Sequence, residues 1–329
     1  MITALALSPA LDVTYVVDRL QGIQRPREVV RVAGGKSLNA ARAAVALGAR
    51  DVAAVAVLAG GAGADVADAA RGDGVSLTAI DGATPTRTCV SIFDVGAGEL
   101  TEIYERPVAV SAAEVDLVLD TALGGRDAAG DWFLLSGGLP QNLAPETVAE
   151  VVRRVRGAGG RIALDTHGPA LRAGAEAGPD LVKVNRAEAV ELLGCAPDAP
   201  GDLLVSRLHG FVSGVGRSSC VVVTDGEDGA WGSDGGEVLR ARRSGPVGAF
   251  PVGSGDSFLG GLMVAFEASL SLREALPLGT AAGAANAQLP GAARLDAAMA
   301  RRLAADIRVD SFSGASALTD QPSCASATT

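Results

Sequence analysis

Lysine, histidine and aromatic residues are scarce in this chain of 329 residues. Of its 28 basic residues only Lys36 and Lys183 are lysines, there are two histidines, and aromatic residues make up 3% of the sequence. The net charge of −10 leaves no broad basic surface for a nucleic-acid backbone or an anionic membrane. An anionic ligand must therefore be bound by a few local cations. The two lysines are the first candidates, because a planar guanidinium does not replace a compact ammonium group.

Cysteine pairs and long apolar runs are also missing. The four cysteines, at positions 89, 195, 220 and 324, form no CxxC pair and have no histidine at metal-ligand spacing. We therefore expect reduced thiols and no structural zinc. No apolar run approaches the roughly 18 residues that span a bilayer, and the amino terminus lacks the basic segment of a secretory signal. A cytoplasmic protein without a membrane partner is expected.

Apolar runs of strand length alternate with helical patterns along most of the chain. Continuous apolar strands between helices predict an α/β fold, with a mostly parallel central sheet that is covered by helices on both faces. The expected strands are residues 3–7, 52–58, 132–136, 161–165, 181–185 and 220–224, and the expected helices are 38–47, 112–123, 145–156 and 202–212.

Two segments break this alternation. Residues 13–32 and 86–104 mix β-branched, charged and aromatic residues without a helical partner. They predict a small antiparallel β lid over the ligand edge of the sheet, with an ordinary pair of surface hairpins as the alternative. One domain is expected over residues 1–310. Residues 311–329 are small and polar with little to bury, so a disordered tail is expected there.

The segment Gly253-Ser254-Gly255-Asp256 places a carboxylate just after a turn of small residues that can open a helix. Backbone N–H groups converge at such a helix start and bind anions, phosphate above all. A carboxylate beside that anion site suits phosphoryl transfer, in which it accepts the proton of an attacking hydroxyl. For this motif taken alone, a flexible turn with Asp256 as an ordinary helix cap is the alternative.

A second glycine turn, Gly34-Gly35-Lys36, leads into an alanine-rich helix with Asn39 on its first turn. The glycines let a ligand approach the backbone, Asn39 can hydrogen-bond sugar hydroxyls, and Lys36 can bind a phosphate. The spacing is not that of a Walker A loop.

Polar and glycine residues also follow the expected strands at their carboxyl ends, which is the edge where parallel sheets bind ligands. These positions include Asp12, Ser136, Asp165, Lys183, Asn185, Glu188, Thr224, Gly226 and Gly229.

Three motifs together resemble those of PfkB-type carbohydrate kinases of the ribokinase superfamily, in order and in spacing: Gly34-Gly35-Lys36-x-x-Asn39, Asn185-x-x-Glu188 and Gly253-Ser254-Gly255-Asp256. The likeness extends to about residue 303. The segments around Asp12, Arg87, Ser136 and Lys183 are most similar to 1-phosphofructokinases and tagatose-6-phosphate kinases.

The resemblance implies a ribokinase-like fold and ATP-dependent phosphorylation of a ketohexose phosphate. Fructose 1-phosphate, converted to fructose 1,6-bisphosphate, is the first choice of substrate. Kinases of tagatose 6-phosphate, of fructose 6-phosphate or of an unphosphorylated sugar remain alternatives. So does a non-catalytic sensor that binds a sugar phosphate or a nucleotide. A homodimer through the lid is expected by resemblance alone.

The resemblance also implies roles for individual residues. Asp256 is the expected general base, and the backbone of Gly253, Ser254 and Gly255 is the expected anion hole. The sugar is expected to contact Asp12, Gly34, Gly35, Lys36, Asn39, Arg87 and Ser136, with Lys36 and Arg87 on its phosphate. ATP is expected near Lys183, Asn185, Glu188, Thr224, Gly226 and Gly229. Asn185 and Glu188, the latter through water, are expected to hold Mg²⁺.

Two positions depart from the family pattern. Ser37 replaces the usual glycine after Lys36, and Phe250 stands where an Asp or Asn is usual.

Several of the motif residues also have plainer alternatives. Asp12 could cap a turn, Asn185 and Glu188 could be the capping pair of a helix over residues 186–193, and Arg87 could be a solvated strand residue. The two histidines, at positions 167 and 209, match no catalytic position of the family.

Overall fold

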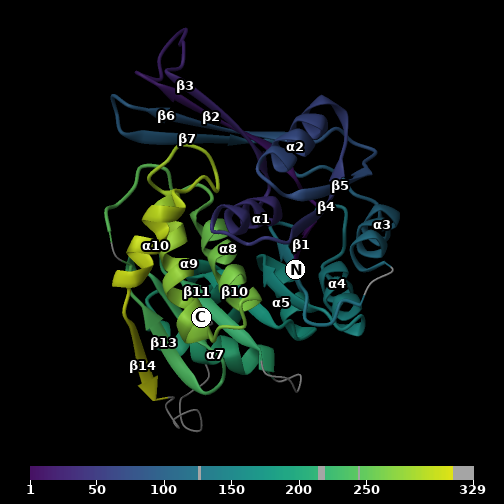
Figure 1. Ribbon diagram of the computed structural model, residues 1–329, viewed down its shortest axis with the longest axis vertical. Coiled ribbons are helices and arrows are strands. Elements are labelled where there is room, and N and C mark those ends of the chain that lie inside the picture. Colours follow the sequence, from purple (N-terminus) through teal and green to yellow (C-terminus); the bar gives the residue numbers. More distant parts are fainter. Residues whose placement is uncertain (125–126, 214–218, 244, 314–329) are drawn as a thin grey trace, which may run out of the picture.

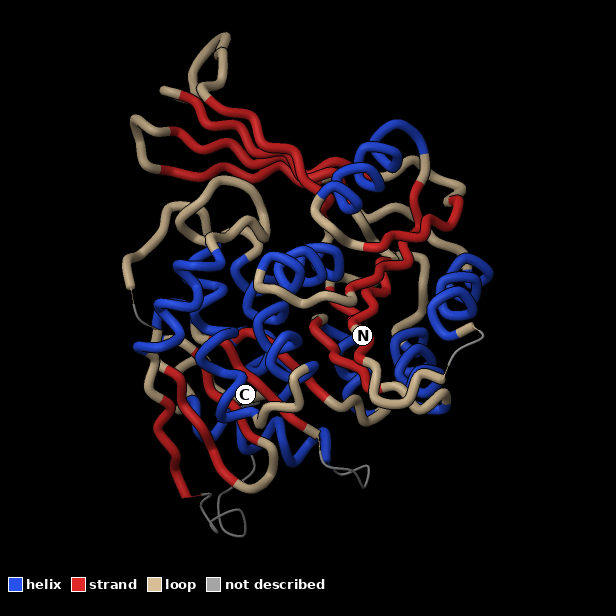
Figure 2. The backbone as a smooth tube through the Cα atoms, in the orientation of Figure 1, coloured by secondary structure: helices blue, strands red, loops and turns tan. Residues whose placement is uncertain are grey.

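The computed structural model describes residues 1–124, 127–213, 219–243 and 245–313. Within them, the largest element is a ten-stranded sheet of order β14-β13-β12-β11-β10-β9-β8-β1-β4-β5 (Figures 1 and 2). Seven neighbouring strands of this sheet, from β11 through β1 to β5 in the order just given, run parallel. The other three strands extend the sheet beyond β11 in antiparallel fashion. The parallel strands are β1 (Ile2–Ala6), β4 (Val52–Leu58), β5 (Ser76–Asp81), β8 (Trp132–Ser136), β9 (Arg161–Asp165), β10 (Leu181–Asn185) and β11 (Cys220–Thr224). The antiparallel strands are β12 (Ala230–Ser233), β13 (Glu237–Ala241) and β14 (Val309–Ser313).

Helices cover both faces of this sheet and create two apolar layers. Neighbouring strand residues point to opposite faces, so Ala4 of β1 lies in one apolar cluster and Leu5 in the other. Burial on both sides explains why the strands are apolar throughout and why the sequence predicted a parallel sheet. One face is covered by α1 (Lys36–Ala46), α2 (Gly60–Gly72), α8 (Ser254–Glu267) and α9 (Leu272–Asn286), with α10 (Ala297–Asp306) packed on α9. The other face is covered by α3 (Ala112–Leu123), α4 (Glu146–Gly157), α5 (Gly168–Glu176), α6 (Arg186–Leu193) and α7 (Gly201–Ser213). None of the helices in the described residues is long and apolar enough to cross a membrane.

A separate four-stranded sheet forms the lid and projects at the top left of Figure 1. Its strands are β3 (Glu28–Gly34), β2 (Ala10–Val17), β6 (Arg87–Asp94) and β7 (Glu99–Tyr104), in that order. The outer pairs are antiparallel as expected, whereas the central pair, β2 with β6, runs parallel. Because β2 follows closely on the end of β1, the lid is rooted at the carboxyl edge of the main sheet.

The carboxyl-terminal prediction was wrong at its boundary. Residues 311–313, expected in a disordered tail, belong to β14 and pair with β13. The physical reason is that β13 offers an unpaired edge and that Phe312 packs on Trp231, with ring centroids 5.4 Å apart. The domain therefore extends beyond residue 310, and the rest of the predicted tail lies outside the described residues.

The described cysteines, Cys89, Cys195 and Cys220, are free thiols, as the sequence predicted. Burial raises the pKa of both Cys89 and Cys220 to about 11, so these thiols stay protonated at neutral pH. Cys324 lies outside the described residues.

Candidate active site

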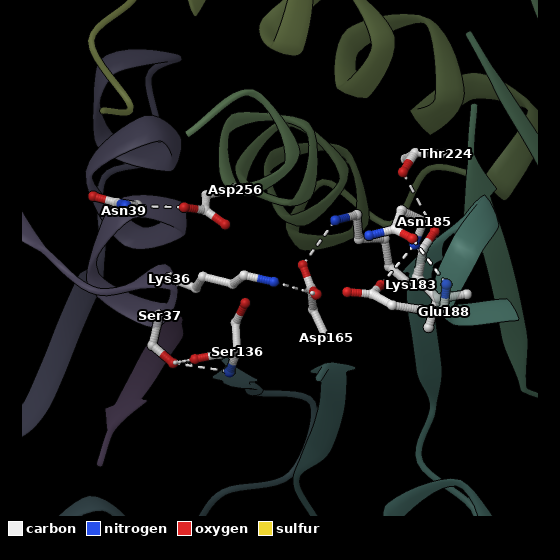
Figure 3. Close-up of polar contacts among 11 residues, drawn as sticks. Lys36, Ser37, Asn39, Ser136, Asp165, Lys183, Asn185, Glu188, Thr224 and Asp256 are labelled. Carbon is white, nitrogen blue, oxygen red and sulfur yellow. Dashed lines mark hydrogen bonds and ion pairs between the residues drawn. The ribbon is translucent and has the colours of Figure 1, made fainter. Parts of the chain in front are cut away.

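The predicted site residues come together at the carboxyl edge of the parallel sheet (Figure 3). The ends of β8 to β11 and the amino termini of α1 and α8 face this edge. Figure 3 shows Lys36, Asp165 and Asp256 between Asn39 on one side and Glu188 on the other. The strand-end argument thus predicted the location of the cluster.

Asp256 lies in the first turn of α8. Gly253 precedes the helix with a φ of 81°, and a Cβ at that position would lie 2.4 Å from the backbone nitrogen of Ala293, so only glycine fits. Asp256 is 6% exposed and accepts a hydrogen bond of 2.9 Å from Nδ2 of Asn39. Its side chain does not cap the helix, so the alternative of an ordinary cap is wrong.

Backbone amides at the start of α8 form the candidate anion site. The first N–H groups of a helix lack intrahelical acceptors, and the helix dipole adds positive charge around them. The N–H of Ser254 donates to the carbonyl oxygen of Pro251 at 3.0 Å. The N–H groups of Gly253 and Gly255 have no acceptor in the part of the chain that the structure describes. The predicted turn is present, and two of its three amides are available to an anion.

The environment of Asp256 favours a near-neutral pKa. Burial, with the negative charge of Asp165 as the next cause, raises the pKa of Asp256 to about 6. The charges of Lys36 and Lys183 and the hydrogen bond from Asn39 act in the opposite direction. A carboxylate with this pKa is ionised at neutral pH and still basic enough to accept a proton, which is the property that a general base needs.

Asp165, at the end of β9, binds both lysines of the chain. Its Oδ2 accepts a hydrogen bond of 2.8 Å from Nζ of Lys183, and its Oδ1 lies 3.6 Å from Nζ of Lys36 (Figure 3). Asp165 is 1% exposed and Lys183 is 4% exposed. Burial alone would raise the pKa of Asp165, but the two ammonium groups outweigh burial and lower it.

Asp165 stands at a predicted strand end, but no role was predicted for it from the sequence. The signal that could have found it was charge balance, because a buried lysine needs an anionic partner. Nothing in the sequence itself shows that Lys183 is buried next to this particular aspartate.

Asp12 lies against the first glycine turn. A Cβ on Gly34 would lie 2.1 Å from Cγ of Asp12, and Gly35 has a φ of 92°. Burial and then the charge of Asp256 raise the pKa of Asp12 to about 7. Asp12 is a residue of β2 rather than of a turn, so the turn-cap alternative is wrong.

Ser37 joins the glycine turn to the end of β8. Its hydroxyl donates to the carbonyl oxygen of Ser136 at 3.0 Å and accepts from the N–H of Ser136 at 2.9 Å (Figure 3). Ser37 is 2% exposed, so this departure from the family pattern stabilises a loop instead of presenting a new group to a ligand. The buried hydroxyl of Ser136 has no hydrogen-bond partner in the described residues, which leaves it available to a sugar.

Arg87, at the start of β6, is anchored at the same edge. Its guanidinium donates to the carbonyl oxygen of Glu105 at 3.1 Å and to that of Ser8 at 3.4 Å. The bond to Ser8 ties the start of β6 to the end of β1, and the bond to Glu105 stays within the lid. Arg87 is therefore a half-buried, bonded strand residue rather than a freely solvated one.

Asn185 and Glu188 form a capping box at the start of α6, as their alternative interpretation predicted. The Asn185 side chain accepts from the N–H of Glu188 at 2.9 Å, and Oε2 of Glu188 accepts from the N–H of Asn185 at 2.8 Å. The capping bonds do not remove Glu188 from the site. Figure 3 shows Glu188 beside Asp165 and Lys183, and its charge, after those of Asp165 and Asp256, contributes to raising the pKa of Lys36.

A cavity of about 230 Å³ adjoins the anion site. Its lining includes Thr224, Gly226, Gly229, Ser254, Gly255 and Thr280. The hydroxyl of Thr280 is buried and has no hydrogen-bond partner among the described residues. The ammonium group of Lys183 lies close to Gly255 at the edge of this cavity: a Cβ on Gly255 would be 3.0 Å from Nζ of Lys183. Of the residues predicted for the nucleotide, Thr224, Gly226 and Gly229 line this cavity beside the start of α8. Lys183, Asn185 and Glu188 do not line it.

Asn286 of α9 holds the loop that leads into α8, and it was not predicted from the sequence. Its Nδ2 donates to the carbonyl oxygens of Phe250 at 3.3 Å and Val252 at 2.8 Å, and to Oγ of Ser254 at 3.1 Å. A lone asparagine in a helix gives no sequence signal for such contacts. Phe250, the second departure from the family pattern, packs on Phe93 of the lid, with ring centroids 4.7 Å apart.

A family model described as pfkB family carbohydrate kinase matches residues 7–298. The chain belongs to this family. The family assignment and the fold class expected from the sequence are both confirmed.

Several known relatives of this pfkB family protein are named 1-phosphofructokinase. The one from Rhodobacter capsulatus is 33% identical over 203 residues, which span 60% of this chain and 61% of the relative. The one from Haloferax volcanii is 31% identical over 291 residues, which span 85% and 88% of the two chains. Among solved structures, phosphofructokinase-2 from Escherichia coli in complex with potassium matches with a TM-score of 0.84 at 24% identity, over 93% of this chain and 98% of that chain.

Proposed function

We propose that this protein transfers the γ-phosphoryl group of ATP to a hydroxyl of a ketohexose phosphate, with fructose 1-phosphate converted to fructose 1,6-bisphosphate as the first choice. One observation carries the proposal. Asp256 is buried beside the amides that begin α8, with Asn39 on one side and the cavity containing Gly255 on the other. The relatives named 1-phosphofructokinase support the choice of sugar phosphate.

In this proposal Asp256 is the general base. It takes the proton of the attacking sugar hydroxyl while that oxygen bonds to the γ-phosphorus. The bond from this phosphorus to the bridging β–γ oxygen breaks, and ADP leaves. The amides of Gly253 and Gly255 stabilise the charge of the transferring group, and Lys183 adds positive charge on the ATP side. The Ser254 amide, bonded to Pro251, keeps the turn in shape.

The sugar phosphate occupies the lid side of Asp256. Its hydroxyls meet the polar groups of Asp12, Asn39 and Ser136, and the Gly34-Gly35 turn lets it approach the backbone. Its phosphate meets Lys36, whose side chain is 39% exposed, and Arg87. Both cations are held at the edge, Lys36 by Asp165 and Arg87 by two carbonyl oxygens.

ATP and Mg²⁺ are the cofactors that the proposed reaction requires. The cavity beside Gly255 takes the nucleotide, and the free Thr280 hydroxyl offers it a hydrogen bond. Mg²⁺ prefers oxygen ligands and keeps several waters, so a site with few protein carboxylates fits it. Asn185 and Glu188, the latter through water, are proposed to hold the ion. When bound, it neutralises phosphate charge.

A substrate panel tests the proposal. ADP release is measured with ATP, Mg²⁺ and, separately, fructose 1-phosphate, fructose 6-phosphate, tagatose 6-phosphate, fructose and ribose. We expect the highest kcat/KM with fructose 1-phosphate. Preference for another sugar phosphate, or for an unphosphorylated sugar, would reassign the substrate. Binding by calorimetry without turnover of any sugar would replace the kinase with a non-catalytic sensor.

Assembly and location complete the proposal. Ile103 and Tyr104 of β7 are 59% and 48% exposed, so the lid presents apolar and aromatic groups that suit a homodimer contact. Light scattering on the protein and on an Ile103→Glu variant would test this, since the variant should be monomeric. Cytoplasmic location stays a prediction from the sequence.

A further inference from the structure

Arg42 is a nearly buried charge directly behind the candidate active site. It lies on α1 one turn after Asn39 and is 5% exposed. Its Nε lies 2.5 Å from Oδ2 of Asp73, and its Nη1 donates to the carbonyl oxygens of Ala33 and Ala292, both at 3.1 Å. Nη1 also donates to Oδ1 of Asn39 at 3.4 Å. Burying a cation is costly unless it is paired and bonded, so this arrangement calls for a reason.

The contact with Asn39 decides which way its amide points. A guanidinium has donors and no acceptor, so the side of Asn39 that faces Arg42 must be the oxygen. The amide nitrogen then faces Asp256, to which it donates at 2.9 Å. With the amide turned over, its oxygen would face the carboxylate of Asp256 and its N–H groups would face the guanidinium. Both contacts would be repulsive.

The other two contacts of Arg42 reach the remaining parts of the site. Ala33 immediately precedes the Gly34-Gly35 turn on the sugar side. Ala292 belongs to the loop packed on Gly253, since a Cβ on Gly253 would lie 3.0 Å from the carbonyl carbon of Ala292. The guanidinium of Arg42 therefore contacts three parts of the site. They are the chain just before the Gly34-Gly35 turn, the side-chain amide of Asn39 that bonds to Asp256, and the loop of Ala292 that packs on Gly253.

We propose that Arg42 is a positioning residue of the phosphoryl-transfer site, which holds the Asn39 amide in the orientation that keeps Asp256 aimed at the sugar hydroxyl. Asp73, which is partly exposed, pairs with Nε of Arg42 and holds the guanidinium in place. The inference rests on the proposed function, because it assumes that Asp256 is the base. Arg42 itself touches neither substrate nor nucleotide.

A double-mutant cycle in kcat separates this role from a purely structural one. Arg42→Met should lower kcat by up to about 100-fold, the cost of a small misplacement of a catalytic group. The KM for ATP should not change, because Arg42 does not line the nucleotide cavity. In an Asn39→Ala background the same change should cause a clearly smaller loss, because the amide contact is gone and only the contacts with Ala33 and Ala292 remain. Equal losses in both backgrounds would overturn the inference.

A milder variant and a matched control complete the test. Asp73 is 44% exposed, so Asp73→Asn should fold even where Arg42→Met does not. It should cause a smaller loss of kcat than Arg42→Met, and this loss should again shrink in the Asn39→Ala background. Arg301 also donates to a backbone carbonyl at an end of α1, that of Leu47 at 3.0 Å, so Arg301→Met is the control. It should leave kcat unchanged, and an equal loss of kcat there would overturn the inference.

The failure of the inference and the failure of the proposed function give different results. If the wild-type protein turns over no sugar of the panel, the proposed function fails. Urea unfolding of the wild type, Arg42→Met, Asn39→Ala and the double variant then tests the contact itself. We expect the two substitutions to be non-additive in the free energy of unfolding. Additive free energies would show that Arg42 does not act on Asn39.

Discussion

Nζ of Lys183 lies 2.8 Å from Oδ2 of Asp165, and both side chains are almost completely buried. Lys36 approaches the other oxygen of the same carboxylate, so the two lysines of the sequence converge on one acid. This acid lies between the proposed positions of the sugar phosphate and of ATP. Its orientation therefore determines where both ammonium groups are held.

Asp165→Asn should weaken the binding of both substrates, whereas Lys36→Met should weaken only that of the sugar phosphate. The reason is that Asp165 holds both lysines, while Lys36 faces the sugar side alone. Steady-state KM values for ATP and for the sugar phosphate check this. Asp165→Asn should also cost about 3–5 kcal/mol of unfolding free energy, because it leaves Lys183 buried without its anion. An unchanged KM for ATP in Asp165→Asn would contradict the shared role.

The rate should fall on the acid side of pH 6 to 7. Burial raises the pKa of Asp256 to about 6 and that of Asp12 to about 7, so both lose their charge at a higher pH than an ordinary aspartate. A base that has taken up a proton cannot accept the one from the sugar. A profile of kcat/KM between pH 5 and 9 measures this limb, and a flat profile down to pH 5 would contradict it.

Asn39→Ala is the control for this pH limb. The Asn39 hydrogen bond lowers the pKa of Asp256, so removing it should move the limb to higher pH. A sugar phosphate loses its own second proton near pH 6, as phosphate monoesters do, but that ionisation is the same for both proteins. If the acid limb of the profile lies at the same pH in Asn39→Ala as in the wild type, it reports the ionisation of the sugar phosphate and not that of Asp256.

Asp12→Asn should stabilise the fold at pH 8 while raising the KM for the sugar. The raised pKa means that the folded protein holds this proton more tightly than the unfolded chain does. Above pH 7 the ionised carboxylate therefore destabilises the fold, by about 2 kcal/mol once solvent screening is allowed for. This penalty disappears as the pH falls from 7 toward 4. Urea unfolding should show a large stability difference at pH 8 and a small one at pH 5, and equal differences would contradict the assignment.

The contact between Phe93 and Phe250 should couple the lid to the loop before α8. Phe93→Leu and Phe250→Leu should be non-additive in unfolding free energy by about 0.5–1.5 kcal/mol, the value of an aromatic pair. Either change should raise the KM for the sugar more than that for ATP, because β6 also carries Arg87. Leu117→Ala, at a 52% exposed position of α3, is the control and should change neither KM. Strict additivity would show that the two rings stabilise their segments separately.

Local pattern was enough to predict the parallel strands other than β5, and the edge at which the candidate site residues gather. Strands such as β10 and β11 are buried on both faces and therefore apolar throughout, and parallel strands align their carboxyl ends at one edge. Ser136, Asp165 and Asn185 end parallel strands and lie at that edge for this reason. The antiparallel extension of β12 to β14 was not predicted, because these short strands depend on pairing with an existing edge.

The side-chain contacts that hold the site residues in position could not be predicted from the sequence. Asn39 and Asp256 are 217 positions apart in the chain, and Arg42 lies 250 positions from Ala292. Contacts at such separations follow from how α1 and α8 pack, and a single sequence does not show which arginine is buried. The contacts made by Asp165, Arg42 and Asn286 were therefore visible only once the fold was known.

The most direct test of the catalytic account is kcat of Asp256→Asn with the sugar that the wild type phosphorylates best, measured together with ATP affinity by calorimetry. Loss of the base should lower kcat by roughly 10²–10⁴-fold. The dissociation constant for ATP should stay close to that of the wild type, because the nucleotide cavity does not include Asp256. A kcat similar to that of the wild type would show that Asp256 does not take the proton and would contradict the account.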